Sequence, residues 1–284
     1  MSFFNKNSGK KVDFLIIGAQ KCGTSSVFNH LILHPALCGS KEKEINYFNN
    51  HYNYKLGEKW YHAHWKKFGK KGNHYFEGSP IYWYNTFTPE RIAAYNPEMK
   101  FICLVRDPVK RAFSHYNMYK HITASQESKD RAFRWNFQHY NPEIENFVQN
   151  VFFNPKGFPT FEQFIDEEME LMTKSLSNMP EPSFLRRGLY LEQLERFYNF
   201  FPRERFIIFE NLELEKETEM VLNRICKFIG ADMVKWDTDL INKKHHLREY
   251  FEPMKEETFI KLSQFYKPFN EKFLTRIGKN YQWS

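Results

Sequence analysis

The chain has 284 residues, which is enough for one large α/β domain with an ample core, or at most two domains. Its formal net charge of +7 favours an anionic ligand, but the basic residues are spread along the chain, which argues against nucleic-acid binding. The four cysteines are scattered, and no stretch approaches the ~18 consecutive apolar residues of a membrane-spanning helix. We therefore expect a soluble, cytoplasmic protein with no membrane or nucleic-acid partner.

The first element expected is a buried strand over Phe14–Gly18, followed by a glycine loop and a helix that begins at Thr24. A strand, a glycine loop and a helix N-terminus in this order form a cradle for phosphate. The two glycines, the second of them Gly23, have the spacing of a Walker A loop, but the lysine is Lys21, inside the loop. The loop therefore lacks the Lys-Ser/Thr pair that holds the terminal phosphates and magnesium of a nucleoside triphosphate. The competing interpretation is a simple tight turn.

A charge run follows the first helix and becomes abruptly aromatic at Tyr47. From spacing alone, Glu42 and Glu44 belong to a solvated charged segment. An amphipathic helix is expected over Gly57–Phe68, a short strand over His74–Pro80, and another helix from Pro89.

A second apolar run, Lys100–Val105, has the pattern of a parallel strand buried on both faces. Arg106 follows it directly, and Pro108 is well placed to begin a helix that carries Ser114. Ligands of open α/β sheets bind beyond the carboxyl ends of the strands. We therefore expect Arg106 and the glycine loop to open onto the same crevice.

The pattern of apolar residues weakens over residues 121–159, and a segment of this length is expected to be a lid, an acceptor-binding excursion or a disordered insertion.

Strands alternating with helical patterns predict a mainly parallel α/β sheet in a single domain over residues 1–284. The later elements expected are helices over Thr160–Leu171, Gly188–Phe200, Glu213–Ile229, Lys255–Tyr266 and Pro268–Ile277, and a strand over Arg205–Phe209.

Taken together, Gly-x-x-Lys-x-Gly-Thr-Ser in the first loop, a strand ending in Arg-Asp-Pro, and a serine eight residues after that arginine resemble the sulfotransferase family. Among its branches, the chain looks most like the heparan sulfate and bacterial carbohydrate type. The resemblance covers most of the chain except Lys120–Pro159. It extends through Leu33–Pro35, Glu44–Phe48, Phe76–Trp83, Leu104–Tyr116, Arg187–Pro202 and Tyr266–Trp283.

The resemblance implies a P-loop NTPase-like three-layer fold and the donor 3′-phosphoadenylyl sulfate (PAPS), with no metal required. The acceptor would be a hydroxyl or amine on a saccharide or other small metabolite, and Glu44 would be its general base. Lys21 would stabilise the bridging oxygen of the donor, while Arg106 and Ser114 would bind its 3′-phosphate. The loop residues that would cradle the 5′-phosphosulfate are Gln20, Lys21, Cys22, Gly23, Thr24 and Ser25, and Arg248 and Tyr250 are further candidate donor contacts.

The chain departs from the family pattern in several places. Gly78 stands where the glycosaminoglycan members of the family usually have lysine. The family also has a donor-binding Lys-Gly-Arg loop near the C-terminus, and the corresponding region here, Asn242–Tyr250, matches it poorly. The cysteine pair and membrane anchor of the animal Golgi enzymes are not seen in this sequence. These departures leave the acceptor open.

Two other functions stay open at this point. One is a P-loop nucleotide kinase or NTPase, which needs a metal-holding carboxylate such as Asp107. The other is a non-catalytic module that binds anionic glycans through the basic, aromatic segment Arg131–Trp135.

Overall fold

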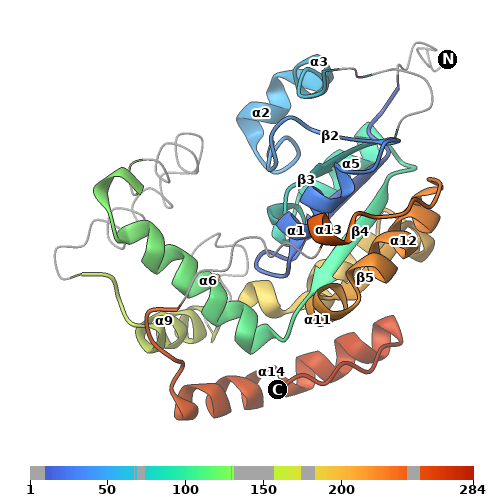
Figure 1. Ribbon diagram of the computed structural model, residues 1–284. Coiled ribbons are helices and arrows are strands. Elements are labelled where there is room, and N and C mark those ends of the chain that lie inside the picture. Colours follow the sequence, from blue (N-terminus) through green and yellow to red (C-terminus); the bar gives the residue numbers. More distant parts are fainter. Residues whose placement is uncertain are drawn as a thin grey trace. The chain divides into compact units, whose positions relative to one another are not determined.

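The computed structural model describes residues 10–66, 68, 74–128, 130, 157–173, 183–241 and 250–284 (Figure 1). The chain divides into two compact units, each made of two segments. The first unit comprises Met1–Val105 and Arg196–His246, and the second comprises Arg106–Glu195 and Leu247–Ser284. The expectation of a single domain over residues 1–284 stays a prediction.

A five-stranded sheet forms the centre of the first unit, with the strand order β2-β3-β1-β4-β5 and every pair parallel. All residues of β1 are buried, as are all but the first of β4, because parallel strands covered on both faces are apolar throughout. The prediction of an α/β fold with a central parallel sheet is confirmed. The strands are β1 (Phe14–Gly18), β2 (Leu37–Gly39), β3 (His74–Gly78), β4 (Lys100–Val105) and β5 (Phe206–Glu210).

Helices cover both faces of this sheet, as the alternation of side chains along β3 shows. Phe76 packs against Phe28 of α1, with ring centroids 5.2 Å apart. The next residue, Glu77, points to the opposite face and accepts hydrogen bonds from Tyr61 of α3 and Tyr82 of α4. The predicted three-layer arrangement is therefore confirmed. The helices named here are α1 (Thr24–Leu31), α3 (Gly57–His62) and α4 (Ile81–Tyr84).

One helix was expected over Glu213–Ile229, and two are present. Reciprocal capping between Glu210 and Glu213 begins the first helix earlier than predicted. The two helices separate at Glu217, whose φ of −136° and ψ of 47° are not helical. The remaining helices of this unit are α2 (His51–Lys55), α5 (Thr88–Tyr95), the 3-10 turn η2 (Arg203–Arg205), α11 (Asn211–Lys216), α12 (Thr218–Ile229) and α13 (Thr238–Ile241).

The second unit is helical in its described part. Its apolar core joins Phe113 of α6, Phe164 of α9 and Tyr266 of α14 through Phe184, which precedes the 3-10 turn η1. The elements are α6 (Pro108–Thr123), α9 (Phe161–Thr173), η1 (Arg186–Gly188), α10 (Tyr190–Tyr198, whose last three residues fall in the first unit) and α14 (Glu256–Ile277).

The expected break at Pro268 was wrong, because α14 is a single helix that contains this proline. A proline in a helix interior costs about 3 kcal/mol. Buried residues continue on one face of the helix on both sides of Pro268 and supply the compensating tertiary contacts. These residues are Leu262, Tyr266, Asn270 and Phe273.

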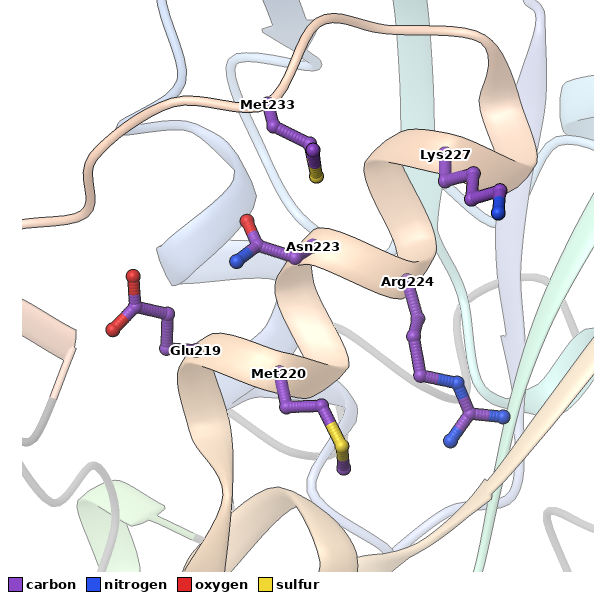
Figure 2. A pocket seen from close by; sticks show the side chains of 6 residues that line it. All are labelled: Glu219, Met220, Asn223, Arg224, Lys227 and Met233. Atoms are coloured by element: carbon purple, nitrogen blue, oxygen red, sulfur yellow. The ribbon is translucent and has the colours of Figure 1, made fainter.

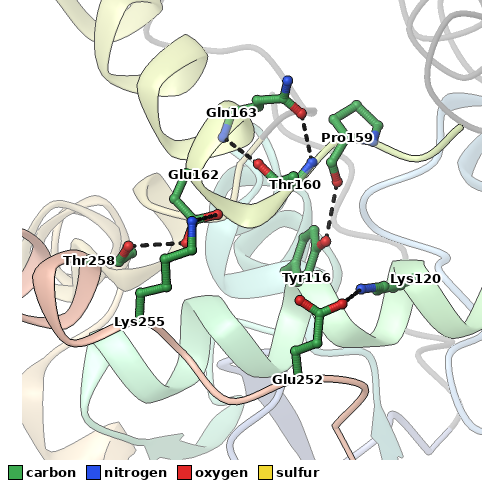
Figure 3. Close-up of polar contacts among 9 residues, drawn as sticks. All are labelled: Tyr116, Lys120, Pro159, Thr160, Glu162, Gln163, Glu252, Lys255 and Thr258. Atoms are coloured by element: carbon green, nitrogen blue, oxygen red, sulfur yellow. Dashed lines mark hydrogen bonds and ion pairs between the residues drawn. The ribbon is translucent and has the colours of Figure 1, made fainter. Parts of the chain in front are cut away.

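Polar contacts hold the start of α9 and the approach to α14 beside α6 (Figure 3). The Tyr116 hydroxyl donates to the carbonyl oxygen of Pro159 over 3.2 Å. Lys120 pairs with Glu252 at 3.1 Å, and Glu162 pairs with Lys255 at 3.7 Å. Of the insertion expected over 121–159, residues 129 and 131–156 lie outside the described residues. No helix in the described part of the chain is long and apolar enough to cross a bilayer.

Candidate active site

The loop between β1 and α1 has the geometry of a phosphate cradle. Gly23 precedes α1 in the left-handed region, with φ 95°, which an L side chain rarely adopts. A Cβ atom there would lie 3.1 Å from the Leu214 side chain of α11. The position therefore requires glycine for its conformation and for its close packing.

The N-terminus of α1 has two features that favour an anion. Gly23 supplies no capping side chain, and the first turn contains no acidic residue. Amide groups at a helix N-terminus carry partial positive charge, so an anion is stabilised there. Lys21 has φ 70°, an uncommon conformation for a non-glycine residue that is typical of functional loops. The predicted residues Gln20–Ser25 thus lie together in one turn of chain before and into α1.

Glu44 lies at the same edge of the sheet as this loop. The amide of Ser79 donates to the carbonyl of Ile16 in β1 over 3.1 Å, and the amide of Glu44 donates to the carbonyl of Gly78 over 3.0 Å. Both contacts fall at the carboxyl ends of parallel strands, where ligands of such sheets bind. Glu44 has φ 66°, and its partly exposed carboxylate pairs with Lys43.

From residue type alone, His34 and His74 are weaker rivals of Glu44 for the role of general base, and neither is placed for it. Both ring nitrogens of His34 are used, one by the amide of Ala36 at 3.1 Å and the other by the carbonyl of Asp232 at 2.9 Å. His74 begins β3 and therefore lies at the amino edge of the sheet.

Sequence reasoning missed a buried carboxylate behind the Glu44 loop. Glu77 is fully buried, and burial raises its pKa to about 7 against the opposing effect of its hydrogen bonds. The only sequence signal for it is an acidic residue inside an apolar strand.

Gly78, the residue after Glu77, faces the opposite side of the sheet, and a side chain there would begin 3.2 Å from the Phe28 ring. The lysine that the glycosaminoglycan sulfotransferases usually have at this position would therefore have little room here.

In the second unit, Arg106 directly follows the last residue of β4. The Tyr190 hydroxyl fixes its backbone, donating to the Arg106 carbonyl over 2.8 Å and accepting from the Arg106 amide over 3.4 Å. Asp107 caps α6 by accepting from the amides of Val109 and Lys110, at 2.9 and 3.3 Å. Its other oxygen accepts from the amide and hydroxyl of Ser284, at 3.0 and 2.7 Å. The carboxylate that a kinase would need for magnesium is therefore occupied by structural contacts.

The remaining predicted donor contacts are only partly described. Ser114 lies on α6 and is 9% exposed. Tyr250 is exposed, and its ring packs edge-on against Phe113 with centroids 5.1 Å apart. Arg248 and the segment Arg131–Trp135 lie outside the described residues.

An open hollow of about 460 Å³ lies along α12 and the loop after it (Figure 2). None of its lining residues is a predicted site residue, so we assign the hollow no part in the reaction. The lining residues are Glu219, Met220, Asn223, Arg224, Lys227 and Met233.

Within the described ranges, no group of three or more His, Cys, Asp or Glu side chains could hold a metal ion.

Several curated proteins are similar to this chain over most of its length. A membrane-associated sulfotransferase, kil1, of Dictyostelium discoideum is 23% identical over 95% of the chain and 66% of its own length. The heparan sulfate glucosamine 3-O-sulfotransferase 5 of Mus musculus is 27% identical over 95% of the chain and 73% of its own length. The human bifunctional heparan sulfate N-deacetylase/N-sulfotransferase 2 is 29% identical over 76% of the chain but only 22% of its own length.

The fold is also that of a solved sulfotransferase. The crystal structure of a sulfotransferase from Alicyclobacillus acidocaldarius superposes with a TM-score of 0.67, covering 96% of this chain and 98% of the other at 20% identity. This likeness confirms the expected P-loop NTPase-like fold. The family model of the sulfotransferase domain matches residues 11–280. The chain therefore belongs to the sulfotransferase family.

Proposed function

We propose that this protein transfers a sulfuryl group from PAPS to a hydroxyl or amine of a saccharide or other small metabolite. The observation that carries the proposal is the conformation of the loop after β1. The backbone of Lys21 in this loop is left-handed, and the first turn of the helix that follows, α1, contains no acidic residue. Membership of the sulfotransferase family supports the donor. A saccharide acceptor is supported by relatives whose names specify heparan sulfate.

The loop residues Gln20–Ser25 would bind the 5′-phosphosulfate end of the donor through backbone amides and hydroxyls. Arg106 and Ser114 would hold the 3′-phosphate, since a guanidinium fork and a hydroxyl suit an isolated terminal phosphate. Arg248 and Tyr250 would contact the nucleotide as well. An arginine in this role needs a fixed backbone, and the Tyr190 hydroxyl contacts both backbone groups of Arg106.

In the proposed step, the acceptor oxygen or nitrogen forms a bond to sulfur while the bond from sulfur to the bridging oxygen breaks. Glu44 takes the proton of the acceptor, and 3′-phosphoadenosine 5′-phosphate leaves. Lys21 stabilises the negative charge that grows on the bridging oxygen, an effect worth about 3 kcal/mol for a preorganised contact. A positioned general base contributes about 10²–10⁴-fold.

Glu44→Gln tests this assignment, with Glu42→Gln as the matched control in the same charged segment. Turnover should be measured with labelled PAPS and a panel of desulfated oligosaccharides, and binding of 3′-phosphoadenosine 5′-phosphate by isothermal titration. We expect Glu44→Gln to lower turnover at least 100-fold with unchanged nucleotide binding, and Glu42→Gln to behave as wild type. Full turnover by Glu44→Gln would remove Glu44 from the mechanism.

A further inference from the structure

A buried polar cluster lies directly behind the loop that carries Glu44. Its members, Tyr61, Glu77, Ser79 and Tyr82, all have side chains fully shielded from solvent. The Glu77 carboxylate accepts hydrogen bonds from the Tyr61 hydroxyl at 2.8 Å and from the Tyr82 hydroxyl at 3.0 Å. The Ser79 hydroxyl also donates to it. Burying an ionisable group is costly, so this cluster calls for an explanation beyond packing.

The carboxylate fixes the direction of these hydrogen bonds. A tyrosine hydroxyl has one proton, and the Tyr82 hydroxyl directs this proton to Glu77. The lone pairs of the Tyr82 oxygen can therefore accept hydrogen bonds from other groups. They accept from the amide of Tyr47 at 2.9 Å and from that of Phe48 at 3.4 Å. In the same way, the Ser79 oxygen accepts from the amide of Asn46 at 3.3 Å.

The loop held by these contacts has a strained backbone. Glu44 and Asn46 both adopt the left-handed region, with φ 66° and 55°. Such conformations are energetically unfavourable and persist only where the surroundings determine them. Further bonds join the Glu44 amide to the Gly78 carbonyl at 3.0 Å and the Asn53 side chain to the Ile45 carbonyl at 3.0 Å.

We propose that Glu77 is a positioning residue for sulfuryl transfer, which fixes the Glu44 loop through the hydroxyls of Ser79 and Tyr82. The proposal rests on the proposed function, in which Glu44 takes the proton of the acceptor. If Glu77 were protonated and donated its proton to the hydroxyl of Ser79 or Tyr82, that hydroxyl could no longer donate to the carboxylate. It would then direct its own proton toward a loop amide, which is also a donor, and the contact would be lost. A displacement of about 1 Å in a reacting group can cost 10²-fold in rate.

Glu77 is the group of this cluster that titrates near neutral pH. Burial is the largest influence on it and raises its pKa to about 7. The phenols that face it or lie one ring beyond, Tyr61, Tyr82, Tyr47 and Tyr95, have pKa values raised chiefly by burial and stay neutral in this range. The next titratable groups are His62, which contacts the Tyr95 hydroxyl at 2.8 Å, and Glu58, Arg91 and Lys11 around these rings.

Two phenylalanine substitutions separate positioning from general stability. Tyr82→Phe removes one hydrogen bond to Glu77 and the oxygen that accepts from the loop amides. Tyr61→Phe removes one hydrogen bond to the same carboxylate but leaves the contacts of Tyr82 with the loop. Both rings and their packing remain. We expect Tyr82→Phe to lower kcat at least tenfold more than Tyr61→Phe, with KM for the donor unchanged in both. Amide hydrogen exchange at Tyr47 and Phe48 should accelerate at least tenfold in Tyr82→Phe alone.

Glu77→Gln keeps the shape of Glu77 but supplies donors where the carboxylate accepts. We expect wild-type kcat to decline below about pH 7 as Glu77 gains its proton. Glu77→Gln should lower kcat at least tenfold and should lack this decline. If Tyr82→Phe fails to fold, Ser79→Ala makes the same comparison at the Asn46 amide. Equal kcat in the two tyrosine variants, with unchanged exchange at the loop amides, would overturn the proposal. Full turnover by Glu44→Gln would instead overturn the proposed function, so the two failures are distinguishable.

Discussion

Replacing the buried Glu77 with glutamine should change how the free energy of unfolding depends on pH. Burial raises the pKa of Glu77 from 4.5 to about 7, and the hydrogen bonds from Ser79, Tyr61 and Tyr82 oppose this rise. The folded protein therefore binds this proton more tightly than the unfolded chain does. The resulting stabilisation is complete below pH 4.5 and is lost as the pH rises through about 7.

The size of this effect follows from the two pKa values. A rise from 4.5 to about 7 corresponds to about 3 kcal/mol, at about 1.4 kcal/mol for each pH unit. Glutamine keeps the shape of the side chain but does not titrate. The difference in free energy of unfolding between wild type and Glu77→Gln should therefore fall by about 3 kcal/mol as the pH rises from 4.5 to above 7.

Urea denaturation of both proteins at a series of pH values measures this difference. Among the described residues, burial lowers the pKa values of four histidines from 6.5. Their stabilisation is therefore lost as the pH falls below 6.5 and through the lowered pKa values, opposite to the effect of Glu77. They occur in both proteins and cancel in the comparison. A difference that stays constant with pH, or grows as the pH rises, would refute the reasoning. The four are His51, His62, His64 and His74.

Lys21→Met should lower kcat about 100-fold, because about 3 kcal/mol of charge stabilisation is lost, and single-turnover kinetics measures this. Gly23→Ala should destabilise the protein by about 1–2 kcal/mol in thermal unfolding, through its positive φ and the contact with Leu214, and should weaken nucleotide binding. Tyr190→Phe should weaken binding of 3′-phosphoadenosine 5′-phosphate several-fold by freeing the Arg106 backbone, while the KM for the acceptor stays unchanged. Turnover should persist in EDTA, since the loop lacks the lysine and hydroxyl pair of a Walker A motif. A loss of turnover in EDTA that added magnesium restores would contradict this prediction.

The sequence was sufficient for the features set by local pattern. The continuous apolar runs at Phe14–Gly18 and Lys100–Val105 predicted two buried strands, and both are present. The structure adds that they are neighbours in the sheet. Pro108 predicted the start of α6 correctly, and the structure adds that Asp107 caps this helix. The turn between β1 and α1 was likewise predictable from the spacing of its two glycines.

Features that depend on tertiary contacts were not predictable. The strand β2 has three residues, too few for a periodic signal. The path of α14 through Pro268 depends on a buried face that only the folded unit provides. The left-handed backbone of Glu44 and Asn46 is held by contacts with residues more than thirty positions later. The Glu44 amide donates to the Gly78 carbonyl, and the Asn46 amide donates to the Ser79 hydroxyl. The cluster around Glu77 became visible only when the fold brought Tyr61 and Tyr82 to one carboxylate.

We propose that one nucleotide is bound by the loop after β1 and, through its 3′-phosphate, by Arg106. Isothermal titration of wild type and Arg106→Met with 3′-phosphoadenosine 5′-phosphate and with adenosine 5′-phosphate tests it most directly. A charged hydrogen bond is worth about 1.5–3 kcal/mol, so wild type should prefer the bisphosphate by about 10- to 100-fold, and Arg106→Met should lose most of that preference. An undiminished preference in Arg106→Met would contradict the account.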